Sequence, residues 1–275
     1  MPDVSVDDTS PQPWTDPATE IRADGPAVLE WAARYLEGIG ERPVLAPVEP
    51  GWVRSQLPEA PPAEAEPWDA ILADLDRVIA PGTAHWQSPG WYAYFQSNSS
   101  APAVLAEALI TTFGVQGMLW HTGPACTEVE TLVLDWLAGL LDLPAAFRSA
   151  AAGGGAGGGV IQDSASSSTL VAVLAARDRA RRAGAGIDDL VAYTSVDAHS
   201  SVEKGLRVAG LLSEQLRAVP VDATRAMDPA ALASFVGADR DAGRTPFIVV
   251  GTVGTTSTHG MDPLGAIGEV ATAEG

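Results

Sequence analysis

The stretch SVDAHSSVEKGLRVAG, residues 195–210, carries two side chains that can do chemistry near neutral pH. They are His199, one of four histidines, and Lys204, the only lysine in the chain. An imidazole can stack on a ring or move a proton, and a lysine amine can form a Schiff base. Ser200 and Glu203 have the spacing of a capping box, which predicts a helix start with His199 in the loop before it, facing a site. Lys204 then lies one turn into the helix, on its surface, so His199 is the residue we expect to be functional.

Serine-rich residues at the start of another predicted helix form a second candidate site, for an anion. Ser164, Ala165 and Ser166 stand where a helix predicted over residues 166–183 begins. Unpaired backbone N–H groups and hydroxyls converge at such a point, and the helix dipole favours an anion there. The pattern is typical of a phosphate site, although an N-cap with surplus serines explains it as well.

A glycine- and threonine-rich loop, GTVGTTSTHGMD at residues 251–262, follows the most apolar predicted strand. Loops at the carboxyl ends of parallel strands are where sheet proteins build their sites. Thr256 offers a hydroxyl there. His259 is either a ligand or base, or an ordinary exposed loop histidine.

An aromatic segment, HWQSPGWYAYFQSNSS at residues 85–100, is either part of the core or the wall of an apolar pocket with polar orienting groups. The residues of interest in it are Trp86, Tyr94, Phe95 and Ser97. Only their surroundings can decide between the two interpretations.

Spacing argues against three other kinds of site. The four histidines have no metal-ligand spacing, so we predict no metal. The pattern G-x-S-x-G is absent, which leaves serine hydrolysis without a nucleophile elbow. Gly153, Gly155 and Gly158 formally match G-x-G-x-x-G, but no strand precedes them and no helix opens at the last glycine, which favours a flexible linker over a dinucleotide site.

Charge and cysteine content narrow the possible partners and compartment. Acidic residues outnumber basic ones 35 to 16, giving a net charge of −19 that repels nucleic acids and anionic membrane surfaces. The acidic, proline-rich N-terminus does not resemble a secretory signal, and the single cysteine, Cys126, excludes an internal disulfide. We therefore expect a cytoplasmic protein that binds neither nucleic acid nor membrane.

The pattern of apolar residues predicts the elements that position these residues. Residues 1–24 are expected to be a disordered acidic tail, and the proline-rich residues 41–68 an extended segment. Helices are predicted at 27–39, 68–79, 102–112 and 127–142. Strands near 190–194, 216–220 and 246–252 then alternate with helices at 166–183, 201–211, 229–238 and 264–273. This alternation predicts an α/β fold with a mostly parallel sheet covered by helices on both faces.

Five motifs in order resemble the pyridoxal-phosphate-dependent group II decarboxylases, the aromatic-L-amino-acid decarboxylase family. They are HWQSPGWYAYFQSNSSAPAVLAE, GVQGMLWHTGPACTEVETLVLDWL, GGGVIQDSASSSTLVAVLAARDRA, AHSSVEKGLRVAG and PFIVVGTVGTTSTHGMDPL. The resemblance runs from about residue 27 to residue 275. It implies the type I fold of pyridoxal-phosphate enzymes: a helical N-terminal arm, here residues 25–84, and the first part of a large cofactor-binding α/β domain, here residues 85–275.

The resemblance also implies a role for each candidate residue. Ala165 and Ser166, with Ser164 beside them, would hold the phosphate of pyridoxal 5′-phosphate, and Thr256 would be a further cofactor contact. His199 would stack on the pyridine ring and reach the substrate. The substrate pocket would be bordered by Tyr94, Phe95 and Ser97, with Trp86 and Met118 nearby. The implied reaction is decarboxylation of an L-amino acid, aromatic by family, through an external aldimine, in a homodimer assembled through the N-terminal arm.

The same resemblance places the family's Schiff-base lysine and the later part of its fold beyond Gly275. We therefore expect these residues alone not to decarboxylate. Aldehyde synthesis or decarboxylation of an acidic amino acid on the same fold stays open, as does a non-enzymatic remnant that acts as a binding module. Relatives that form aldehydes often replace the stacking histidine by asparagine, so His199 favours simple decarboxylation.

Overall fold

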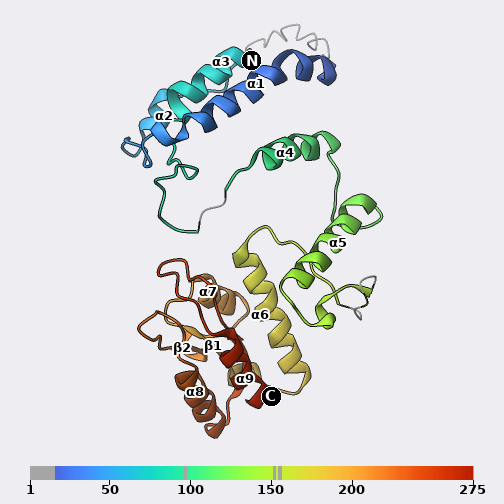
Figure 1. The fold of residues 1–275 in the computed structure, drawn as a ribbon, viewed down its shortest axis with the longest axis vertical. Helices are drawn as coiled ribbons and strands as arrows, with labels where there is room; N and C mark the ends of the chain where they lie inside the picture. Colours follow the sequence, from blue (N-terminus) through green and yellow to red (C-terminus); the bar gives the residue numbers. More distant parts are fainter. Residues whose placement is uncertain (1–15, 96–97, 151–152, 154–156, 275) are drawn as a thin grey trace, which may run out of the picture. The chain divides into compact units, whose positions relative to one another are not determined.

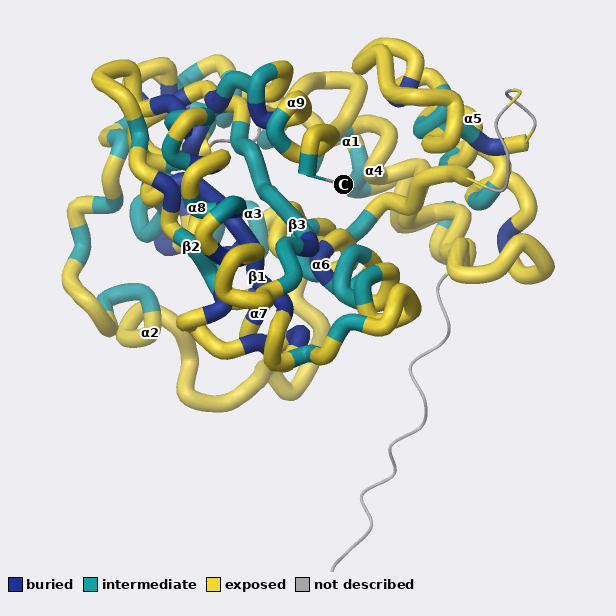
Figure 2. Tube along the Cα trace, turned by 90° about the horizontal axis from the view of Figure 1, so that it is seen from below, coloured by how far each residue is buried: buried dark blue, intermediate teal, exposed yellow. Residues whose placement is uncertain are grey.

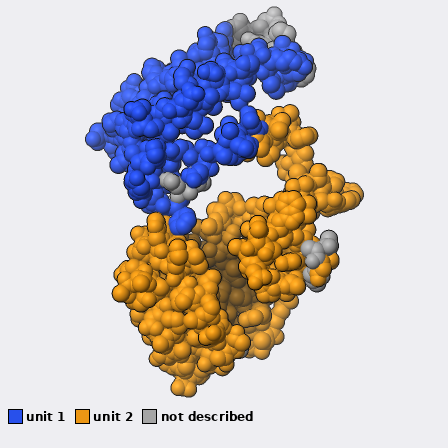
Figure 3. All heavy atoms as spheres, viewed as in Figure 1, with its two compact units in different colours: residues 1–105 blue, residues 106–275 orange. Residues whose placement is uncertain are grey.

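The structure is a computed structural model that describes residues 16–95, 98–150, 153 and 157–274. Its Cα packing divides the chain into two compact units, residues 1–105 and 106–275 (Figure 3). The boundary that the resemblance implies between the N-terminal arm and the α/β domain lies earlier, after residue 84.

A three-stranded parallel sheet forms the core of residues 165–274, within the second unit (Figure 1). Its strands are β1 (Leu190–Ser195), β2 (Leu216–Val219) and β3 (Thr245–Val250), in the order β2-β1-β3. Every residue of β1 is buried, because both faces and both edges of this strand are covered. A continuous apolar segment such as LVAYT is typical of a strand in that position.

Four helices flank the sheet: α6 (Ala165–Arg182), α7 (Ser201–Val208), α8 (Pro229–Asp241) and α9 (Leu264–Glu274). One core cluster joins Val173 of α6 and Leu206 of α7 to Ala192 of β1. The other joins Leu232 of α8 and Ile267 of α9 to residues of β1 that point the other way. Helices therefore cover both faces, and the predicted parallel α/β arrangement is confirmed.

A buried polar network holds α8 on the sheet. The Tyr193 hydroxyl donates to Asp239 Oδ2 at 2.9 Å, and Arg217 Nε donates to the same oxygen at 2.9 Å. Burial and the hydrogen bond to Asp239 raise the pKa of Tyr193 well above its ordinary range. Burial opposes ionisation of Asp239, but the hydrogen bonds from Arg217 and Tyr193 outweigh it and lower the pKa of this carboxyl.

The first unit contains α1 (Pro17–Glu37), α2 (Trp52–Gln56) and α3 (Trp68–Asp74), which continues into a π-helical turn, Leu75–Ile79. Helix α1 begins about ten residues before the predicted start, so the expectation of disorder is wrong for residues 17–24. The Asp16 carboxylate accepts from the Ala18 N–H at 3.1 Å, and Pro17 suits the first helical position. Proline at this point therefore begins the helix.

His85 packs against α1 in the same unit. Its Nδ1 lies 2.8 Å from the Tyr35 hydroxyl, and its side chain is only 3% exposed. Burial, followed by the charge of Arg42, lowers the pKa of His85 below its usual 6.5. Arg42 also lies over the Tyr35 ring, 5.0 Å from its centroid. The neutral imidazole is therefore the form that this environment favours.

Two more helices, α4 (Ala101–Phe113) and α5 (Pro124–Leu140), follow the aromatic segment. Both are strongly apolar, yet most of their residues are exposed (Figure 2). In α5, Trp136 is 59% exposed and Leu140 is 84% exposed. Within the described part of the chain, no helix combines the length and apolar character needed to cross a membrane.

Short 3₁₀ turns connect several of these elements. They are η1 (Ile39–Glu41), η3 (Ala145–Phe147), η5 (Ile187–Asp189) and η6 (Ser213–Gln215).

Candidate functional site

Three loops leave the carboxyl ends of the strands: residues 196–200 after β1, 220–228 after β2 and 251–263 after β3. Because the strands are parallel, the loops lie along one edge of the sheet. The first loop carries His199 and the third carries Thr256. Two of the predicted site residues are thus brought to the same edge.

His199 caps helix α7. The Ser201 N–H donates to His199 Nδ1 at 3.2 Å. Ser200 makes no side-chain capping bond, and Glu203 Oε1 instead accepts from Arg207 at 2.6 Å, so the predicted capping box is wrong. The His199 side chain is longer than that of Ser200, so its ring can accept from the Ser201 N–H two residues later. Since Nδ1 accepts a hydrogen bond, the ring proton of the neutral form sits on Nε2, which is left as a donor.

The start of α6 has two backbone donors without an acceptor. The Ser164 hydroxyl accepts from the Ser167 N–H at 3.2 Å, and the Ser164 carbonyl accepts from the Ser168 N–H at 3.0 Å. Within the described residues, the N–H groups of Ala165 and Ser166 have no hydrogen-bond acceptor. An 18-residue helix adds the positive end of its dipole at this point. These are the donors that an anion requires.

A cavity of about 210 Å³ lies between the start of α6 and the loop of His199, since Ser166 and His199 both line it. Lys204 lies on the same wall. Its side chain is exposed on α7, as predicted, but it also borders the site, which the sequence did not indicate. Helices α6 and α7 pack closely here, and a Cβ at Gly205 would make an ordinary contact with the Leu170 Cα, at 3.6 Å.

The loop that carries Thr256 is folded back on itself. The N–H groups of Gly254 and Thr255 both donate to the Gly260 carbonyl, at 3.1 and 3.0 Å. The fully buried Thr255 hydroxyl accepts from the Gly260 N–H at 3.0 Å. Thr256 itself is half-buried beside this anchored turn, and His259 is exposed with a φ of 57°.

The aromatic segment forms a stacked cluster in the first unit. The Trp86 ring lies 4.6 Å from that of Trp91 and 5.8 Å from that of Tyr94. Trp91 is buried, whereas Trp86, Tyr94 and Phe95 keep large exposed surfaces. Trp91 is therefore a core residue, and the other three rings lie at the surface of this unit.

The pocket roles of Trp86, Tyr94, Phe95, Ser97 and Met118 all stay predictions. Ser97 lies outside the described residues. Met118 is exposed and belongs to the second unit.

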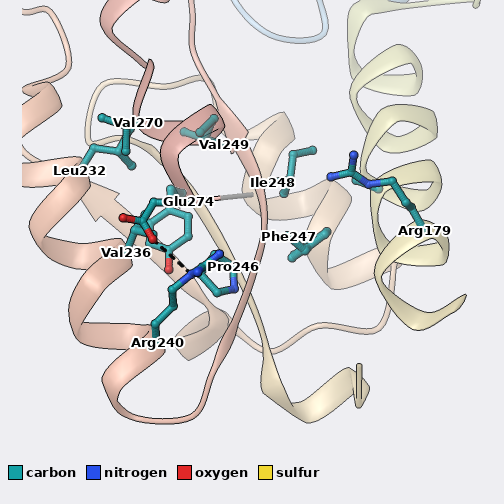
Figure 4. Close-up of a pocket in the computed structure, with 13 residues that line it drawn as sticks. Arg179, Leu232, Val236, Arg240, Pro246, Phe247, Ile248, Val249, Val270 and Glu274 are labelled. Carbon is teal, nitrogen blue, oxygen red and sulfur yellow. Dashed lines mark ion pairs between the residues drawn. The ribbon is translucent and has the colours of Figure 1, made fainter. Parts of the chain in front are cut away.

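A second, larger cavity of about 290 Å³ lies elsewhere in the second unit (Figure 4). Apolar residues such as Val236, Phe247 and Val249 line it, and an ion pair between Arg240 and Glu274, 3.3 Å apart, closes one side. It borders the start of β3 and the ends of α6 and α8, and contains no predicted site residue. Ligands of parallel sheets bind at the opposite ends of the strands, so the smaller cavity is the candidate site.

Metal-binding groups are not clustered in the part of the chain that the structure describes. Among the described residues, there is no group of three or more histidine, cysteine, aspartate or glutamate side chains that could hold an ion.

Comparison with known proteins points to one family. The pyridoxal-dependent decarboxylase conserved domain matches residues 50–275. The aromatic-L-amino-acid decarboxylase of Mus musculus is 44% identical over 266 residues, which cover 93% of this chain and 54% of that protein. The phenylacetaldehyde synthase of Arabidopsis thaliana is 40% identical and covers 93% of this chain and 52% of its own length.

A solved structure agrees with these sequence matches. The crystal structure of Oryza sativa TDC with PLP and tryptamine superposes with a TM-score of 0.87 at 37% identity, over 95% of this chain and 54% of that one. The chain therefore spans about half the length of the relatives it matches.

Proposed function

Because this chain belongs to the pyridoxal-dependent decarboxylase family, we propose that its residues serve the decarboxylation of an aromatic L-amino acid with pyridoxal 5′-phosphate. The names of the relatives support the substrate class, and the solved TDC contains both PLP and tryptamine. The observation that carries the proposal is the pair of unpaired N–H groups at the start of α6, beside the cavity that Ser166 shares with His199.

The start of α6 fits the cofactor phosphate. Ala165 and Ser166 supply N–H donors, the Ser164 hydroxyl already accepts from the Ser167 N–H, and the helix dipole favours the dianion. Thr256 adds a hydroxyl from the anchored loop after β3. When bound, pyridoxal phosphate supplies a sink for the electron pair that departing CO₂ leaves at Cα.

His199 orients the reacting groups. Its hydrogen bond from the Ser201 N–H fixes the ring on the first turn of α7. When pyridoxal phosphate is bound, the flat imidazole would stack on the cofactor ring, and Nε2–H would donate a hydrogen bond toward the substrate. The resemblance predicts that Trp86, Tyr94, Phe95, Ser97 and Met118 border the substrate side chain.

A relative that is a phenylacetaldehyde synthase favours a second outcome on the same fold, oxidative aldehyde formation. The histidine at position 199 supports simple decarboxylation instead. Comparing amine and aldehyde products from L-tyrosine and L-tryptophan would separate the two, in a protein in which this chain is joined to the later part of the family's fold.

The absence of turnover by these 275 residues alone also stays a prediction. Incubation with pyridoxal phosphate, borohydride reduction and peptide mass mapping test it. Lys204 is the only lysine available, so an adduct that disappears in Lys204→Arg, together with CO₂ release, would contradict the prediction.

We propose a homodimer as the assembly, formed through the N-terminal arm. The exposed apolar side chains of α4 and α5, which follow the arm in the sequence, support association in general, because exposed apolar faces are typical of interaction surfaces. The choice of the arm rests on the family resemblance. Mass measured against protein concentration tests it, and a monomeric mass up to high micromolar concentration would contradict it.

One substitution tests the phosphate site directly. Ala165→Pro removes a single N–H donor, while proline suits the first position of a helix and the extended Ser164 before it. Loss of a charge-assisted hydrogen bond weakens pyridoxal phosphate binding by about tenfold or more. Ala165→Gly keeps the N–H and serves as the control. Equal affinities of the two variants in a spectroscopic titration would exclude this donor from the site.

A further inference from the structure

We infer that Asp197 is a positioning residue that holds the loop of His199 against the loop of Thr256. The inference rests on the proposed function for its consequence, cofactor binding, and on the contacts below for its geometry. Neither Asp197 nor its partners stand out in the sequence, because the partners lie 28 and 61 residues away.

The first contact joins the loops after β1 and β2. Asp197 Oδ1 accepts from Arg225 Nη2 at 2.6 Å. The aspartate side chain is 10% exposed and the arginine side chain 51% exposed. Arg225 has a φ of 67°, an uncommon backbone conformation for a residue with a side chain. The pair fixes the direction of the Arg225 side chain, whereas its net contribution to stability is small because water screens the arginine.

The second contact joins the loops after β1 and β3. Asp197 Oδ2 accepts from the Thr258 hydroxyl at 3.1 Å. Thr258 Oγ1 also lies 2.7 Å from Thr255 Oγ1, and Thr255 is the buried anchor of its loop. One carboxylate therefore reaches the turn that carries Thr256 through two hydroxyls.

A second carboxylate braces the same edge. Asp262 is 4% exposed; its Oδ1 accepts from the Met227 N–H at 2.7 Å, and its Oδ2 from the Thr252 N–H at 2.8 Å. This joins the loops after β2 and β3. Gly260 lets them meet, since a Cβ there would lie 2.1 Å from the Arg225 carbonyl oxygen. Together the two carboxylates link all three loops.

The consequence falls on His199, two residues after Asp197. The His199 imidazole is held at the start of α7 by the hydrogen bond from the Ser201 N–H. The backbone that leads to His199 is held by the contacts of the Asp197 carboxylate. Consecutive Cα atoms are only 3.8 Å apart, so a shift of Asp197 is passed on to His199. Freeing the carboxylate would let the His199 and Thr256 loops move independently, and a ligand that contacts both would have to pay the ordering entropy.

Thr258→Val tests the link with the smallest change, because it replaces the donor hydroxyl by a methyl group of similar size. Thr258→Ser restores the hydroxyl. Thr272→Val is the matched control, since Thr272 lies in α9 and its hydroxyl bonds only within that helix, to the Gly268 carbonyl at 2.7 Å. Asp197→Ala removes both contacts at once.

Two measurements are made on the full chain. NMR records the His199 Cε1–H signal, assigned with His199→Gln, without any cofactor. A spectroscopic titration then gives the affinity for pyridoxal phosphate. We expect Thr258→Val to shift or broaden the His199 signal and to weaken binding about tenfold, the effect of losing a hydrogen bond to a charged group. Thr258→Ser should recover both, and Thr272→Val should change neither.

The two hypotheses fail in different ways. If Thr258→Val and Asp197→Ala bind pyridoxal phosphate as tightly as the unaltered chain, the positioning role of Asp197 is overturned. If the unaltered chain does not bind pyridoxal phosphate, the proposed function fails. The NMR comparison still decides the geometry in that case, because an unchanged His199 signal in Thr258→Val overturns the link and a changed one supports it.

Discussion

The sheet region, residues 165–274, differs from the helical region before it, residues 16–147, in how much of its apolar surface is buried. Around the sheet, α6, α7, α8 and α9 each contribute to a core cluster, and β1 is entirely buried. In the helical region, α1 and α4 contain no buried residue, and α5 has one, Ala138. The sheet region thus contains its own core, whereas the helical region presents apolar surface.

This difference separates two tasks. The residues proposed to bind the cofactor, His199 and those at the start of α6, stand on elements that the core already holds in place. The exposed apolar faces of α4 and α5 are typical of surfaces that become buried on association. Substitutions of buried residues should therefore affect folding, whereas substitutions on the exposed faces of α4 and α5 should affect assembly.

The largest effect on stability is expected from Asp239→Ala in the sheet region. It removes the acceptor of the buried Tyr193 hydroxyl and the partner of Arg217, whose side chain is 30% exposed. Breaking a buried pair of this kind costs about 3 kcal/mol. Urea unfolding measures it, with Asp241→Ala, an exposed position of the same helix, as the control. A loss no larger than that of the control would show that the network does not hold α8.

A smaller, pH-dependent effect is expected at His85, one of the buried residues of the helical region. Its pKa is lowered below 6.5, mainly by burial, so the folded chain resists protonation while the unfolded chain takes up a proton near that pH. The stabilisation is complete above pH 6.5 and declines as the pH falls below it. Unfolding free energies at pH 7.5 and 5.5 should differ less in His85→Gln than in the unaltered chain.

His121→Gln is the control for that comparison, since His121 is exposed in the same region. If both variants follow the pH dependence of the unaltered chain, burial of His85 does not make folding sensitive to acid.

The smallest effect on folding, and the clearest effect on assembly, is expected from Leu140→Glu in α5. The side chain is 84% exposed, so the free energy of unfolding should change by less than about 0.5 kcal/mol at a concentration where the chain is monomeric. Association should weaken, because a charge is placed on the apolar face. Thr131→Glu is the control, since Thr131 is exposed two and a half turns earlier, on the opposite side of the helix. Equal association of both variants, measured by sedimentation, would remove this face from the interface.

The elements of the sheet region were predictable because their signals are local. The apolar runs near 190–194 and 246–252 match β1 and β3, and the serine-rich start of α6 lies one residue from its predicted position. The start of α1 was missed because a single capping residue, Asp16, outweighs a composition that favours disorder. At α7 the spacing of Ser200 and Glu203 was right for a capping box, but the neighbouring His199 imidazole competes for the same helix end.

The sequence by itself determined the periodicity of helices and strands, the parallel order that brings three loops to one edge, and the unpaired donors at the start of α6. These follow from interactions within a few residues and from general rules of chain connection. Only the tertiary structure decided that Lys204 borders the same cavity as His199, and that Asp197 reaches both Arg225 and Thr258. Such contacts depend on how distant loops meet once the core has packed, and no local pattern of residue types records that geometry.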